Sequence, residues 1–218
     1  MGSRFIKIIV LVLISYGFFS CQSETPQKLF DYGKVENGIY SNEYFGFSVQ
    51  IPDKWVVQSR EQQEGLMEAS EKIVTGDDKY MKAVYDAAKV NSAYLLTVFQ
   101  YEVGTYVEYN PNFMIVAENI KNYPGIKDGA EYLKHAKDLL KQTQLQIDTI
   151  SNTFEKKEVS GVLFYSMSAK VRLMDKQITQ QFNTTVKNNF SLSVIYTYLN
   201  EEQEEVLQNT FEGIQFKN

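Results

Sequence analysis

The stretch Tyr44-Phe45-Gly46-Phe47-Ser48-Val49-Gln50-Ile51-Pro52-Asp53-Lys54-Trp55 carries the clearest structural pattern in this 218-residue chain. Apolar side chains stand at every second position from Phe45 to Ile51, and small or polar residues stand between them. This alternation is typical of a β-strand with one buried face. Pro52-Asp53 favours a turn, and residues 55–57 are apolar enough for a second short strand. The stretch therefore predicts a strand, a turn and a strand.

The sequence that follows predicts helices first and then a long run of strands. Apolar residues recur at helical spacing in two segments, 61–74 and 77–89. Asp128 with Glu131 predicts the start of a third helix, and Asn200 with Gln203 the start of a fourth. We expect strands over 93–102 and 112–119, and an antiparallel meander over 149–159, 162–174, 177–186 and 190–199.

The last strand and the last helix are expected to share one apolar layer. Alternate residues from Phe190 to Tyr198 lie on one face of the strand, and five residues of the helix and its end can pack on the sheet: Val206, Leu207, Thr210, Phe211 and Ile214. The order of elements favours an α+β fold, an antiparallel β-sheet sandwiched by helices. We expect one such domain over 38–218.

Two segments resemble known domains of the PsbP/Mog1-like family. The stretch 44–55 is similar to the opening segment of these domains, although Lys54 stands where the family often has glycine. Residues 190–216 resemble their closing strand, acidic helix and terminal Gly213-Ile214-Gln215-Phe216. The middle, with 91–102 after two helices, looks like uncharacterised bacterial lipoproteins that carry such a domain. The resemblance implies the sandwiched sheet and a scaffold for protein contacts, and no functional residue carries over by motif.

The N-terminus has the features of an export signal. Arg4 and Lys7 form a short basic region, and an uncharged run of about 12 residues follows over 8–19. As a helix this run is roughly 18 Å long, whereas a bilayer core is about 30 Å thick. The run is therefore too short to span a membrane without its flanks.

Cys21, the only cysteine, stands directly after this run. Phe18-Phe19-Ser20-Cys21 resembles a lipobox in which Ser20 and Cys21 match and Phe18 replaces the usual leucine. The resemblance implies a signal peptide over 1–20, removal of that peptide, and a lipid on Cys21 that inserts into a membrane. We expect 21–37 to be the lipidated cysteine and a flexible tether, and we place the protein in the bacterial cell envelope, on the periplasmic or outer surface side. The alternative is a plain secretory signal or an uncleaved anchor, with Cys21 a bystander.

Composition and charge indicate an ordinary globular domain and narrow its range of partners. Hydrophobic residues make up 44% and charged residues 22%, as in ordinary globular domains. The net charge of −5 becomes −7 once Arg4 and Lys7 are removed, which disfavours nucleic acid as a partner. With Cys21 lipidated, no disulfide can form, so the domain depends on its hydrophobic core.

The chain lacks the usual sequence signatures of catalysis and metal binding. His135 is the only histidine, too few for a histidine-based zinc site. The acidic clusters at 77–78 and 201–205 stand where helices begin and lack a calcium-binding loop pattern. We therefore expect no cofactor, no metal and no enzymatic activity.

Tyr101, Tyr106 and Tyr109 flank the loop 104–111 and form the candidate contact loop. Exposed aromatic residues on loops suit contacts with a protein partner or a sugar. The alternative is that these rings pack onto the edge of the sheet.

The sequence is compatible with three functions. The leading hypothesis is a non-enzymatic module that binds an envelope protein. The second is a small-ligand or carbohydrate-binding lipoprotein that uses the tyrosine loop. The third is a carboxylate-based hydrolase, which predicts two carboxylates facing each other in one cleft.

Overall fold

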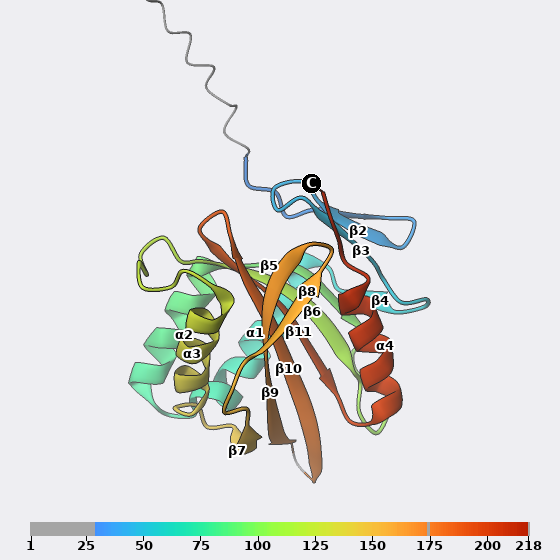
Figure 1. The fold of residues 1–218 in the computed structure, drawn as a ribbon. Coiled ribbons are helices and arrows are strands. Elements are labelled where there is room, and N and C mark those ends of the chain that lie inside the picture. Colours follow the sequence, from blue (N-terminus) through green and yellow to red (C-terminus); the bar gives the residue numbers. More distant parts are fainter. Residues whose placement is uncertain (1–28, 174, 218) are drawn as a thin grey trace, which may run out of the picture.

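The computed structural model describes residues 29–173 and 175–217 (Figure 1). The predicted signal peptide, the predicted lipid on Cys21 and the first part of the predicted tether lie outside the described residues. None of the helices within the described ranges is both long and apolar enough to cross a bilayer.

The centre of the domain is a large antiparallel sheet. Its strands run in the order β4-β5-β6-β11-β10-β9-β7, and β8 also pairs with β9. Their bounds are β4 (Val56–Val57), β5 (Ser92–Phe99), β6 (Asn112–Asn119), β7 (Gln146–Ile150), β8 (Glu155–Val159), β9 (Val162–Leu173), β10 (Lys176–Lys187) and β11 (Phe190–Tyr198).

The central part of the stretch 44–55, Phe47–Gln50, lies in a second, smaller sheet, which the sequence did not predict. This sheet has the order β1-β2-β3-β12, with β1 (Lys34–Glu36), β2 (Ile39–Asn42), β3 (Phe47–Gln50) and β12 (Gln215–Phe216). Residues 43–46 form the turn between β2 and β3, so the strand is shorter than predicted. The Asn42 side chain accepts a hydrogen bond from the Phe45 backbone N–H at 2.8 Å, and Gly46 has φ of 66°, which suits glycine. The predicted alternation is confirmed, because every second side chain from Phe45 to Ile51 is buried.

The predicted tether is too long at its C-terminal end. Lys34–Glu36 pairs with β2 as a strand. The ring of Phe30 contacts those of Tyr44 and Phe190, with ring centroids 5.1 and 5.4 Å apart. Aromatic contacts of this kind add to the free energy of burial, so the domain begins before residue 38. Sequence periodicity does not reveal this segment, because its apolar residues are too few to form a repeating pattern.

Helices cover both faces of the large sheet, as the sequence predicted (Figure 1). The helices α1 (Arg60–Thr75), α2 (Lys79–Asn91) and α3 (Gly129–Leu140) lie on one side, and α4 (Glu201–Glu212) lies on the other. Asp128 and Asn200 accept hydrogen bonds from the backbone N–H groups of Glu131 and Gln203, each at 3.0 Å, so both predicted helix starts are confirmed.

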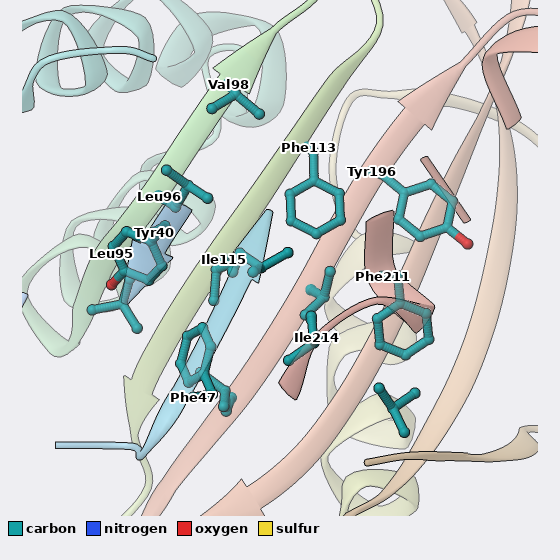
Figure 2. Packing of buried hydrophobic residues seen from close by; sticks show 14 of the residues in the cluster. Tyr40, Phe47, Leu95, Leu96, Val98, Phe113, Ile115, Tyr196, Phe211 and Ile214 are labelled. Atoms are coloured by element: carbon teal, nitrogen blue, oxygen red, sulfur yellow. The ribbon is translucent and has the colours of Figure 1, made fainter. Parts of the chain in front are cut away.

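Two hydrophobic clusters hold these layers together. The larger joins the small sheet and α4 to one face of the large sheet, with Tyr40 and Phe47 on one side and Phe113, Ile115 and others on the other side (Figure 2). The smaller lies under α3 and contains Leu133, Met167 and Phe182. The alternate residues from Phe190 to Tyr198 all contact the larger cluster, as predicted.

Two expectations in the last third of the chain are wrong in detail. The predicted strand 149–159 is two strands, β7 and β8, which both pair with β9 and are separated by residues 151–154. Val206 does not join the core: its side chain is 39% exposed, whereas Leu207, the next residue, is fully buried.

Candidate functional site

A groove lies where the described chain begins, between the N-terminal segment, α1, α2 and the first residues of β5. We call it the N-terminal groove. One part has a volume of about 230 Å³ and the adjoining part about 210 Å³, and the two share Tyr32, Val90 and Ser92. The first part is also lined by Arg60, Gln63, Glu64, Met67, Lys89 and Tyr94, and the second by Phe30, Asn91, Ala93, Asn119 and Phe190.

Arg60 and Tyr32 form one wall of the groove. The helix α1 begins at Arg60 because the Ser59 side chain accepts from the Gln62 N–H and the Gln62 side chain accepts from the Ser59 N–H. The guanidinium carbon of Arg60 lies 3.9 Å from the centroid of the Tyr32 ring. This cation–π contact ties the N-terminal segment to the start of α1. The Tyr40 hydroxyl donates to the Tyr32 carbonyl at 2.7 Å and fixes the segment further.

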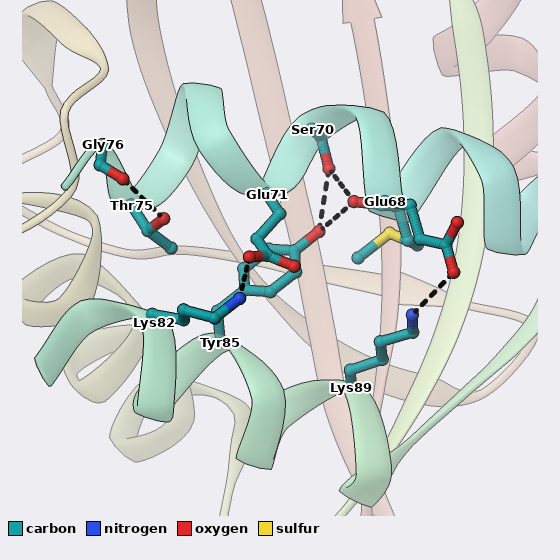
Figure 3. Close-up of polar contacts among 9 residues, drawn as sticks. Glu68, Ser70, Glu71, Thr75, Gly76, Lys82, Tyr85 and Lys89 are labelled. Atoms are coloured by element: carbon teal, nitrogen blue, oxygen red, sulfur yellow. Dashed lines mark hydrogen bonds and ion pairs between the residues drawn. The ribbon is translucent and has the colours of Figure 1, made fainter. Parts of the chain in front are cut away.

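The opposite wall depends on how α1 and α2 pack (Figure 3). Glu71 pairs with Lys82, and the Glu68 carboxylate lies 3.8 Å from the Lys89 ammonium. The Tyr85 hydroxyl donates to the Met67 carbonyl at 2.7 Å. Burial raises the pKa of Tyr85, which further favours the protonated phenol that makes this hydrogen bond. These contacts place Met67 and Lys89 on the lining of the groove.

Apolar side chains around this groove are unusually exposed. Val90 is 85% exposed at the C-terminal end of α2, and Leu29 is 86% exposed at the start of the described chain. Phe30 and Tyr32, which line the groove together with Val90, are also exposed. Exposed apolar side chains that gather at a hollow are typical of an interaction surface. The sequence analysis missed this site, and the available signal was the group Leu29, Phe30 and Tyr32 within an otherwise polar segment.

The predicted contact loop lies at the opposite end of β5 from Ser92. Its three tyrosines do not share one environment. Tyr106 is fully exposed and Tyr101 is 40% exposed, whereas the Tyr109 hydroxyl donates to the Thr197 side chain at 2.5 Å and its ring packs against the cluster under α3. Burial raises the pKa of Tyr109. Tyr101 and Tyr106 remain available for contact, and a role for this loop stays a prediction.

The side chains considered for catalysis or metal binding lie apart from the N-terminal groove. His135 is exposed on α3, with its ring centroid 5.9 Å from that of Tyr123. Within 29–173 and 175–217, no three His, Cys, Asp or Glu side chains gather in a way that could hold a metal ion. Glu155 and Glu204 line the same hollow beside α4. The hydrolase hypothesis requires two carboxylates in one cleft, and this pair is compatible with it, so the hypothesis stays a prediction.

Comparisons with known proteins return similarity in structure only. No family model and no curated protein matches the sequence. The solution structure of a cyanobacterial PsbP (CyanoP) from Synechocystis sp. PCC 6803 is similar over 87% of this chain and 99% of that chain, with 11% identity and a TM-score of 0.47. The crystal structure of LpqN, described as involved in cell envelope biogenesis of Mycobacterium tuberculosis, is similar over 79% of this chain and 83% of that chain, with 12% identity and a TM-score of 0.44. At such values the function has to be argued from the residues of this chain.

Proposed function

We propose that this chain is a lipid-anchored, non-enzymatic module of the bacterial cell envelope that binds another envelope protein through the N-terminal groove. The observation that carries this proposal is the gathering of three exposed apolar side chains, Phe30, Tyr32 and Val90, on the lining of a hollow that also holds charged residues. A monomeric domain normally leaves few such side chains together in water.

The position of the groove relative to Cys21 supports an occupant close to the membrane. Leu29 is only eight residues after Cys21. A fully extended chain covers at most about 3.6 Å per residue, so a lipid on Cys21 would hold Leu29 within roughly 29 Å of the membrane surface. The groove adjoins Leu29 through Phe30, so we infer that the partner presents a segment just outside the bilayer.

The shape and charge of the groove indicate a protein segment as the partner. Tyr32, Met67 and Val90 offer apolar contact inside a concave surface. Arg60 and Lys89 stand beside Glu64, so both signs of charge are available at the rim. An extended segment with one or two apolar side chains flanked by polar ones fits this arrangement.

Val90→Asp is expected to weaken capture of the partner at least tenfold. A carboxylate at this position disrupts an apolar contact, and most of the binding energy of an interface comes from a few such contacts. The domain should remain intact, because the Val90 side chain is 85% exposed. The measurement is affinity capture of the lipidated protein from detergent-solubilised envelopes, with captured proteins quantified by mass spectrometry.

Ile73→Asp is the matched control for this test. Ile73 is 56% exposed on α1 and does not line either part of the groove. The control variant should keep the captured protein at the level of the unmodified chain. Equal capture by the Val90 and Ile73 variants would contradict the proposal. The proposal would also be contradicted if the unlipidated domain bound lipid vesicles and Val90→Asp abolished that binding, because the groove would then bind lipid and not protein.

A further inference from the structure

A second hollow, of about 200 Å³, lies between the large sheet and α4. We call it the α4 hollow. Most of the side chains that line it are polar, in contrast to the N-terminal groove. Six of the lining residues come from four strands and the helix: Glu155, Ser166, Gln181, Asn183, Tyr196 and Glu204.

The floor of the α4 hollow is polar although it lies inside the fold. Ser166, Asn183 and Tyr196 are only 7%, 2% and 5% exposed. Buried amides normally have all their hydrogen bonds made within the protein. The Ser166 hydroxyl donates to Asn183 Oδ1 at 2.6 Å, and Asn183 Nδ2 makes a long contact, 3.4 Å, to the Val194 carbonyl. The Tyr196 hydroxyl accepts the other amide hydrogen of Asn183, so the floor is a fixed polar surface and the open hydrogen-bonding groups lie on the walls.

The walls offer further hydrogen-bonding groups. Gln181 and Glu155 make no side-chain hydrogen bond to any part of the chain that the structure describes, and both line the hollow. The Tyr198 hydroxyl donates to Glu204 Oε1 at 2.6 Å and holds this carboxylate in place as an acceptor. Burial raises the pKa of Tyr196 to about 12, against the opposing effect of the hydrogen bond from Asn183.

The charges of the lining balance. Two carboxylates, Glu155 and Glu204, stand in the same hollow as two lysines, Lys156 and Lys157. Lys157 also pairs with Glu212 on α4. A hollow without net charge disfavours a strongly charged ligand. The free energy needed to remove such a ligand from water is larger than the attraction that a lining without excess opposite charge can supply.

We propose that the α4 hollow binds a single ring of a neutral sugar. Hydroxyl groups both donate and accept hydrogen bonds, which matches a lining that offers amide N–H groups, amide oxygens and carboxylates. The volume is below that of sites for drug-sized molecules, about 300 Å³ and more, which limits the ligand to one ring. This site is separate from the N-terminal groove and does not depend on the proposed function.

A titration monitored by ¹⁵N NMR tests the proposal on the domain without its lipid. The probes are N-acetylglucosamine, glucose and, as a small polyol control, glycerol. We expect saturable shifts at the backbone amides of Ser166, Gln181 and Asn183 with at least one of the two sugars, and none with glycerol at the same concentrations. Absence of saturable shifts with both sugars, or equal binding of glycerol, would overturn the proposal.

Gln181→Leu and Gln180→Leu separate a binding role from a structural one. Gln181 lines the hollow, whereas Gln180 lies on the opposite face of β10, between Ile178 and Phe182 of the cluster under α3. We expect Gln181→Leu to weaken sugar binding about fivefold, the effect of one lost hydrogen bond, and Gln180→Leu to leave it unchanged. Equal affinities for the two variants would contradict a sugar site in this hollow.

Discussion

Gly129→Ala is expected to lower the free energy of unfolding by about 3 kcal/mol. Gly129 is the first residue of α3 and lies directly on β10. A Cβ atom there would come within 2.0 Å of the Thr184 carbonyl oxygen and 2.8 Å of the Thr184 carbonyl carbon. Both are backbone atoms of a strand in the middle of the sheet, so the start of α3 would have to move away. That movement would weaken the packing of Leu133, which is fully buried under the same helix.

Urea denaturation of the two variants Gly129→Ala and Gly65→Ala measures this effect. Gly65 lies in α1, and a Cβ atom there would meet no heavy atom within 4 Å. Alanine at this helical position should therefore stabilise the domain by up to about 1 kcal/mol. A loss smaller than about 1 kcal/mol for Gly129→Ala would show that α3 does not pack on β10 as described.

Phe211→Ala is expected to cost about 4 kcal/mol. The Phe211 side chain is 1% exposed on α4, and its ring meets that of Phe164 edge to face, with centroids 5.2 Å apart. Truncation would leave a cavity between α4 and the large sheet, and it would remove an aromatic contact. The measurement is again the free energy of unfolding in urea.

Val206→Ala is the control on the same helix. Val206 is 39% exposed, so its truncation should change the free energy of unfolding by less than about 0.5 kcal/mol. Similar losses for the Phe211 and Val206 variants would mean that α4 packs with a different face toward the sheet.

The sequence was sufficient for the fold class because local patterns agree with the tertiary contacts. The alternation from Phe45 to Ile51 predicts a buried face, which the structure shows. The capping residues Asp128 and Asn200 predict two helix starts, and both are found. The division into two sheets could not be predicted, since β3 pairs with β12, whose residues lie more than 160 positions further along the chain. Such pairing depends on the assembled core rather than on any local signal.

The candidate sites were harder to predict than the fold. The N-terminal groove combines Tyr32, from the segment before β1, with Arg60 of α1 and Val90 of α2. The α4 hollow gave no signal: Gln181 and Asn183 alternate with the apolar Ile178 and Phe182, so the sequence alone would place their face of the strand in solvent. The tyrosines 101, 106 and 109 were singled out by residue type alone, and the fold places Tyr109 in a packed environment and Tyr106 in solvent.

Photo-cross-linking in intact cells tests most directly whether a lipid anchor and the N-terminal groove act together. A photoreactive amino acid at position 90 should give a cross-link to one envelope protein, and the same group at position 73 should not. The cross-link from position 90 should be lost in Cys21→Ala, because without the lipid the groove is no longer held at the membrane. An equally strong cross-link in Cys21→Ala, or equal cross-links from positions 73 and 90, would contradict the account.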